Sequence, residues 1–72
     1  MSQFNHEQFC ERLKESLKSS GMTLKEAANN ACIAPHMLRK YIEGQSIPRL
    51  GDLRKICAVF HVRADYLLGI SQ

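Results

Sequence analysis

Histidine and cysteine side chains that could bind a metal are spread along this chain of 72 residues. His6 and Cys10 are four residues apart, a spacing that puts two ligands on one side of a helix. The other candidate ligands are Cys32, His36, Cys57 and His61. No C-x-x-C pair or second ligand cluster completes the four positions of a tetrahedral zinc site. We therefore expect neither a metal nor another cofactor.

Catalytic patterns are missing as well. The chain contains no G-x-S-x-G, no glycine-rich phosphate loop and no H-E-x-x-H, and its carboxylates are scattered. Its three cysteines are an odd number at wide spacing, so Cys32 has no nearby cysteine to form a redox pair. This usage is not a disulfide framework and suits a reducing cytoplasm. We expect a protein that is not an enzyme and has no small-molecule substrate.

A cationic helix face is the strongest chemical signal. In the segment 35–43 the apolar residues Met37, Leu38, Tyr41 and Ile42 recur at helical spacing. His36, Arg39 and Lys40 lie largely off that stripe, so the core does not need them. They could be ordinary solvated charges. Placed on the second of two short helices joined by a tight turn, they suit a helix that enters the major groove of DNA.

The placement of charge favours the same interpretation. The net charge is +3, and residues 1–33 carry four Lys or Arg against four Asp or Glu. Residues 34–72 carry six Lys or Arg against three Asp or Glu, so the whole excess lies in the half that begins with the cationic helix. A basic surface favours polyanions, although a charge of this size also serves solubility.

Five helices are expected to position these groups. They span about 5–19, 23–28, 35–43, 49–60 and 64–68, with a turn at 29–34 between the second and the third. Thr23 and Glu26 form the T-x-x-E pattern of a capping box, and Gly21, Gly44 and Gly69 end helices. No segment alternates with period two. The sequence therefore predicts an all-α, compact five-helix bundle with a central helix-turn-helix at about 23–43.

The length fits one domain, 1–72, with a small core. The apolar runs are too short for a membrane span, and Met1–Glu11 is too polar for a signal peptide. We expect a cytoplasmic protein, in a bacterial or phage-infected cell.

Five fragments together resemble the lambda-repressor/Cro-like helix-turn-helix family. They are R-L-K at 12–14, G-M-T-L-K-E-A-A at 21–28, L-R-K-Y at 38–41, G-Q-S-I-P at 44–48 and V-R-A-D-Y-L-L-G at 62–69. The resemblance implies a DNA-binding domain of a phage or bacterial repressor, whose third helix reads base edges. By position, the base-contacting residues would be Pro35, His36, Arg39 and Lys40. The phosphate-contacting residues would be Thr23, Lys25, Gln45, Ser46 and Arg49.

Several residues depart from the family pattern. Leu24 stands where the family usually has Gln, Cys32 and His61 where it has Gly, and Ala34 and Arg63 where it has a Ser or Thr cap. A left-handed backbone at Cys32 would be strained, and Ala34 is a poor cap. These departures keep a second function open: a protein-interaction module on the same fold, such as an antitoxin or anti-repressor component.

The expected partner is double-stranded DNA, bound at a pseudo-palindromic operator by a homodimer, because one small domain makes few contacts. Leu67, Leu68 and Ile70 form an apolar C-terminal cluster. This cluster could pair two subunits or pack back on the domain.

Overall fold

A computed structural model of the chain describes residues 5–69, and all regular structure in that range is helical. The helices are α1 (His6–Ser20), α2 (Leu24–Ala31), α3 (Pro35–Glu43), α4 (Leu50–Phe60) and α5 (Ala64–Leu68). The predicted all-α fold with a helix-turn-helix is confirmed. Within these residues no helix combines the length and the apolar character needed to cross a bilayer.

The helix ends follow local signals. Asn5 caps α1 by accepting a hydrogen bond from the Gln8 amide, and Gly21, Gly44 and Gly69 end helices with positive φ. The predicted bounds hold within about a residue, except that α2 continues to Ala31, so the turn is shorter than the expected 29–34.

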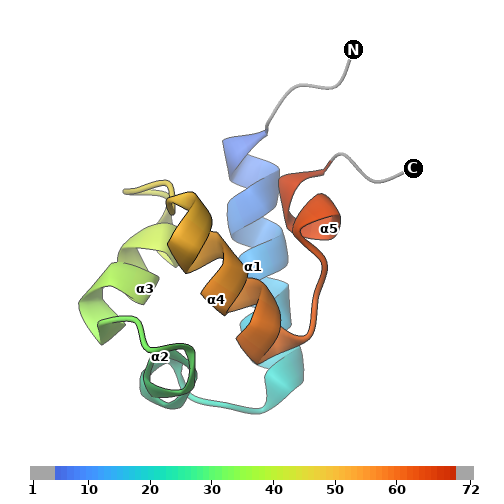
Figure 1. The fold of residues 1–72 in the computed structure, drawn as a ribbon. Helices are drawn as coiled ribbons and strands as arrows, with labels where there is room; N and C mark the ends of the chain where they lie inside the picture. Colours follow the sequence, from blue (N-terminus) through green and yellow to red (C-terminus); the bar gives the residue numbers. More distant parts are fainter. Residues whose placement is uncertain (1–4, 70–72) are drawn as a thin grey trace.

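One core joins the helices. The largest fully buried side chains come from α1, α3, α4 and α5: Phe9, Leu13, Leu38, Ile56 and Leu67. From α2 come Ala27 and Ala28, whose small side chains let α2 lie close to α3 and α4. α1 packs against α3, α4 and α5. In Figure 1, α3 lies at the left edge and α5 at the right, with α1 and α4 between them.

The C-terminal cluster packs back on the domain as far as the structure describes it. Leu67 is 0% exposed and belongs to the core, and Leu68 is half-buried against it. Ile70, the third member of the predicted cluster, lies outside the described residues.

Candidate nucleic-acid interface

The start of α2 is held by a complete capping box. The Thr23 amide donates to Glu26 Oε1 at 2.9 Å, and the Glu26 amide donates to Thr23 Oγ1 at 3.1 Å. These two bonds satisfy amides that a helix start leaves open. The Thr23 hydroxyl accepts in this box, so its own O–H remains a donor for another group.

The turn between α2 and α3 is built on a strained residue. Cys32 has φ 58° and ψ 41°, a left-handed conformation that suits glycine. The turn closes through backbone bonds from Cys32 N to Asn29 O at 3.2 Å and from Ile33 N to Ala28 O at 2.9 Å. Burial of Ile33 secures it further. The left-handed, strained backbone expected at Cys32 is therefore present. His61, which follows α4, has the same conformation, with φ 57°.

α3 begins without a side-chain cap. Ala34 precedes it with no capping hydrogen bond, and Pro35 stands at the first helical position, where its fixed φ fits. Leu38, Tyr41 and Ile42 are buried, which anchors one face of the helix in the core. The predicted apolar stripe is thus confirmed, with Met37 half-buried at its margin.

The opposite face of α3 presents the predicted base-contacting residues to solvent. Pro35, His36, Arg39 and Lys40 are all exposed. Arg39 and Lys40 form no ion pair or side-chain hydrogen bond with another residue in the range 5–69. A rigid helix therefore holds two cations outward with their hydrogen-bonding groups available.

The predicted phosphate-contacting residues lie on both sides of α3 in the chain. Thr23, Lys25, Gln45 and Arg49 are exposed, and Ser46 is half-buried. Thr23 and Lys25 stand at the start of α2, whereas the other three follow α3. The Gln45 amide donates to the Lys40 carbonyl at 2.9 Å, which fixes the backbone where α3 ends. Their contacts with DNA stay a prediction.

A part-buried hydrogen bond joins α3 to α4. Tyr41 is 3% exposed, and its hydroxyl donates to Asp52 Oδ2 at 2.5 Å. Burial, the hydrogen bond to Asp52 and the negative charge of Asp52 together raise the pKa of Tyr41 to about 12, while the charge of Arg49 acts in the opposite direction. Asp52 also lies 3.9 Å from Lys55 Nζ.

The sequence analysis placed Tyr41 on the apolar stripe of the segment 35–43 and gave Asp52 no role. The two residues are 11 apart in the chain and lie on different helices, and no local pattern marks such a pair.

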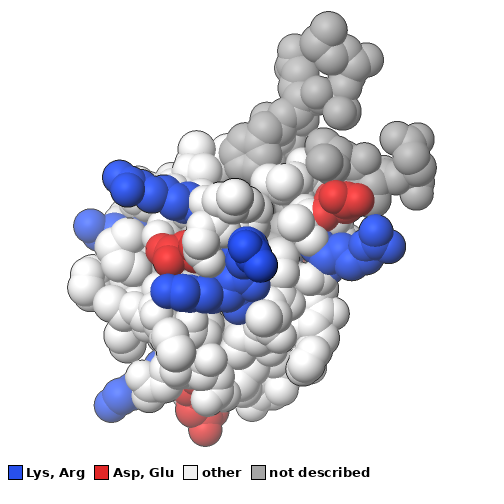
Figure 2. All heavy atoms as spheres, viewed as in Figure 1, with Lys and Arg blue, Asp and Glu red and all other residues white. Residues whose placement is uncertain are grey.

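On the face of the molecule that α3 and α4 form, Lys and Arg side chains outnumber Asp and Glu side chains. In Figure 2, Lys and Arg groups gather over the left and central part of the view, where α3 and α4 lie, with fewer Asp and Glu groups among them. The exposed cations of α3, α4 and their connection are Arg39, Lys40, Arg49, Arg54 and Lys55. Of these, Lys55 alone has an ion-pair partner among the described residues.

Comparison with known proteins bears on this arrangement directly. Residues 13–67, most of the chain, match the helix-turn-helix family. The chain belongs to the Cro/C1-type helix-turn-helix family. This is a family of DNA-binding transcriptional regulators, which is not a class of enzymes.

A relative and a solved structure agree with this membership. The HTH-type transcriptional regulator ImmR of Bacillus subtilis (strain 168) is 38% identical over 58 residues, which cover 81% of this chain and 46% of ImmR. The chain thus spans less than half the length of that relative. The solution structure of the SOS-response transcriptional repressor LexA from Eubacterium rectale matches with a TM-score of 0.81 and 24% identity, over 88% of this chain and 67% of that one. At 24% identity, this match shows only that the two chains share a fold.

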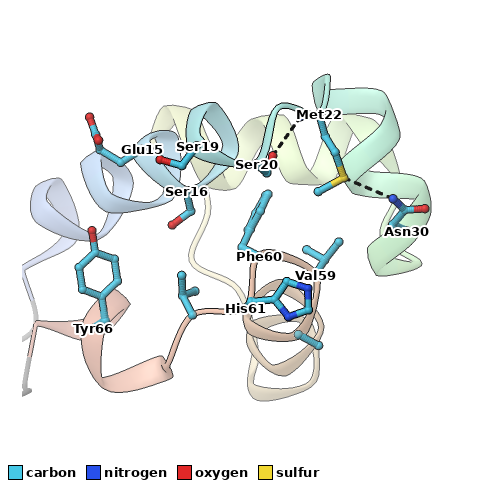
Figure 3. Close-up of a pocket in the computed structure, with 12 residues that line it drawn as sticks. Glu15, Ser16, Ser19, Ser20, Met22, Asn30, Val59, Phe60, His61 and Tyr66 are labelled. Atoms are coloured by element: carbon cyan, nitrogen blue, oxygen red, sulfur yellow. Dashed lines mark hydrogen bonds between the residues drawn. The ribbon is translucent and has the colours of Figure 1, made fainter.

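One hollow in the surface lies away from α3. It has a volume of about 830 Å³ and is lined by the second half of α1, the end of α4 and neighbouring residues of α2 and α5. In Figure 3, Glu15 and His61 point away from one another, so they form no acid–base pair. Among residues 5–69 no three His, Cys, Asp or Glu side chains gather as metal ligands would.

The cysteines are free, and two of them are held in unreactive surroundings. The pKa of Cys10 is raised, because burial outweighs the opposing effect of the Lys14 charge. Burial alone raises the pKa of Cys57. A raised pKa reduces the thiolate fraction on which nucleophilic chemistry depends.

Proposed function

We propose that this domain binds double-stranded DNA sequence-specifically and acts as a Cro-like repressor in the cytoplasm of a bacterial or phage-infected cell. The observation that carries the proposal is the outer face of α3, where Arg39 and Lys40 are exposed and have no side-chain partner among residues 5–69. Membership in a family of DNA-binding regulators supports the same assignment.

Base reading would fall to the outer face of α3 in the major groove. Lys40 and Arg39 suit the O6 and N7 acceptors of guanine, and His36 can donate to either acceptor. Pro35 has no backbone donor, so it would contact a thymine methyl or a sugar. Each good contact of this kind contributes about 1–3 kcal/mol of discrimination between bases.

Phosphate binding would fix the position of α3 in the groove. The cations Lys25 and Arg49 would neutralise phosphates, and Thr23, Gln45 and Ser46 would donate hydrogen bonds. Such contacts set register rather than sequence preference. With two cations in this role, the slope of log affinity against log salt should be about −2 per domain.

A homodimer on a two-fold operator would supply the remaining affinity. Its half-sites should lie about one helical turn apart, so that two α3 helices enter successive major grooves on one side of the duplex. Occupancy of such an operator would repress transcription by excluding RNA polymerase.

Selection from a random pool of duplexes tests the proposal. The purified domain should enrich one sequence with two-fold symmetry and should retard it in an electrophoretic assay more strongly than scrambled DNA. If no sequence is enriched and all duplexes are retarded equally, the domain binds DNA only non-specifically.

A protein-interaction module on the same fold is the second candidate. Leu24 stands where the family commonly has a phosphate-binding Gln, and Ala34 leaves α3 uncapped. The absence of any retardation at low salt would favour this function, as an antitoxin or anti-repressor component.

A further inference from the structure

The spacing between α3 and α4 is set with little direct packing of one helix on the other. α3 packs against α1 and α2, and α4 packs against α1, α2 and α5, whereas α3 and α4 make few contacts with each other in the described range. Residues 44–49 connect them, as the yellow segment of Figure 1 shows. Ile47 in this connection and Leu50 directly after it are exposed, so neither anchors the connection in the core. A specific contact that joins the two helices therefore has a large share in fixing their relative position.

Asp52 supplies such a contact. Its Oδ2 accepts the hydrogen bond from the Tyr41 hydroxyl at 2.5 Å, and Tyr41 is 3% exposed. Because the core holds the tyrosine ring, the carboxylate is tied to a fixed point on α3. Asp52 lies in the first turn of α4, so the bond fixes the end of α4 that directly follows Arg49.

A helix-start role accounts for only part of this arrangement. An acidic residue in the first turn is favourable at any helix N-terminus, where it meets the positive end of the helix dipole. That explains an acid at this position of α4 but not its partner on α3. The Asp52 carboxylate accepts from Tyr41 and also lies 3.9 Å from Lys55 Nζ. It therefore links two helices in addition to starting one.

Cations of the proposed DNA interface surround this link. Burial and Asp52 raise the pKa of Tyr41, and the positive charge of Arg49 lowers it, so Arg49 lies close enough to act on the hydroxyl. Lys40, a predicted base contact, directly precedes Tyr41, and Arg49, a predicted phosphate contact, lies three residues before Asp52. The hydrogen bond thus connects the part of α3 proposed to read bases with the part of α4 proposed to hold a phosphate.

We propose that Asp52 is a positioning residue of the DNA interface, which contacts no base itself but fixes the outer face of α3 relative to Arg49 at the start of α4. The inference rests on the proposed function and adds a residue to which that function gives no part. With the bond in place, a phosphate bound by Arg49 determines where Lys40 stands in the groove. Without the bond, a phosphate at Arg49 no longer directs Lys40 to one base pair.

The charge of Asp52 has a second, separable consequence. The Asp52 side chain is 31% exposed beside the proposed phosphate-binding cations, so its carboxylate repels the phosphates of any sequence. Asparagine in its place can still accept from the Tyr41 hydroxyl through its amide oxygen, but it carries no charge. Phenylalanine in place of Tyr41 removes the bond and leaves the charge. Two substitutions therefore separate position from charge.

Competition binding of the selected operator against random DNA tests the inference, at a temperature where circular dichroism shows each variant to be folded. Tyr41→Phe should reduce the ratio of the two affinities by about fivefold, near the lower end of what one base contact contributes. Asp52→Asn should keep that ratio and should strengthen binding to both kinds of DNA by roughly twofold, because one charge that repels phosphates is gone. Asp52→Leu should combine the two effects, with a lower ratio and stronger binding to random DNA.

Arg12→Ala is the matched control for lost stability. It should destabilise the domain at least as much as Tyr41→Phe, because it removes a hydrogen bond and a ring contact between α1 and α5. It alters neither α3 nor the start of α4. The ratio of operator to random affinity should therefore equal that of the wild type.

Three results would overturn the inference. If Tyr41→Phe keeps the wild-type ratio, packing alone positions α3. If Tyr41→Phe and Arg12→Ala lower the ratio equally, the bond contributes stability and nothing more. If Asp52→Asn weakens binding to the operator alone, the carboxylate contacts a base itself. A wild-type protein that binds operator and random DNA equally, or neither of them, would instead refute the proposed function, and the inference would fall with it.

Discussion

Arg12 and Arg39 carry the same guanidinium group into different surroundings. Arg12, on α1, donates through Nη1 to the carbonyl of Tyr66, and its guanidinium lies 4.8 Å from the centre of the Tyr66 ring. Arg39, on α3, has no side-chain partner among the described residues. Arg12 therefore helps to hold α5 against α1. Arg39 instead projects into solvent from a helix whose opposite face is buried.

The contrast shows that a positive charge alone does not mark a binding surface. Arg63 is highly exposed, but it lies 3.9 Å from Asp65, and such exposed pairs contribute little to stability. The α3 side differs in combining exposure, a rigid support and the lack of an internal partner. These three properties together distinguish a candidate contact residue from a solvated one.

The largest expected effect tests the α3 side. Lys40→Ala should reduce the difference in binding free energy between the selected operator and random DNA by about 1–3 kcal/mol, because a base contact is lost. Its free energy of unfolding should change by less than about 0.5 kcal/mol, since Lys40 is exposed. Competition binding against both kinds of DNA measures the first quantity, and urea denaturation measures the second.

Lys25→Ala is the matched control at a predicted phosphate contact. It should weaken binding to all sequences alike and reduce the magnitude of the salt slope by about 0.9. Equal loss on operator and random DNA for Lys40→Ala would place Lys40 among the phosphate contacts.

The next effect tests the α1–α5 side. Arg12→Ala should lower the free energy of unfolding by about 1–2 kcal/mol, because a charge-assisted hydrogen bond and a cation–π contact disappear together. Discrimination between DNA sequences should stay unchanged in this variant. Arg39→Ala is expected to show the reverse pattern, and urea denaturation of both variants gives the comparison. An Arg12→Ala protein as stable as the wild type would mean that α5 is held by its apolar contacts alone.

Much of the α3 side could be predicted from the sequence because its signals are local. The T-x-x-E pattern placed the start of α2, glycines placed helix ends, and the apolar spacing of 35–43 identified which face of α3 is buried. The left-handed backbone at Cys32 was expected only through the resemblance to a family that has glycine there. No local chemistry distinguishes that cysteine from any other.

The α1–α5 side was less predictable because its polar contacts join distant residues. The Arg12 and Tyr66 pair spans 54 residues. On the α3 side the same difficulty applies to Tyr41 and Asp52, which lie on different helices. Such pairs depend on how far apart the helices settle, which follows from the packing of the whole core. That Arg39 has no side-chain partner within the described range 5–69 is equally a property of the folded molecule.

A smaller effect tests the hydrogen bond that joins α3 to α4. Tyr41→Phe should lower the free energy of unfolding by about 1 kcal/mol at neutral pH, since one part-buried hydrogen bond is lost. The unfolded tyrosine loses its proton near pH 10, whereas the folded one keeps it to about pH 12. Deprotonation therefore stabilises the unfolded state in this window, and the wild-type protein should lose stability from pH 10 to 12.

Denaturation at a series of pH values checks this expectation. Tyr41→Phe should show a smaller fall across the window, and Tyr66→Phe, which keeps the bond to Asp52, should show the full fall. Parallel curves for wild type and Tyr41→Phe would mean that the hydroxyl does not favour the folded state.

The smallest effect concerns the strain in the helix-turn-helix itself. Cys32→Gly should stabilise the domain by about 0.5–1 kcal/mol, because glycine adopts a φ of 58° without the steric cost that a Cβ imposes. For a domain of this size the thermal midpoint should rise by roughly 2–8 °C. Cys32→Ala is the matched control, since it removes the thiol but keeps the Cβ, and it should give no such rise. Equal stabilisation by both substitutions would trace the effect to the exposed thiol. Stabilisation by glycine alone would show that the turn between α2 and α3 holds a backbone conformation that its own residue disfavours.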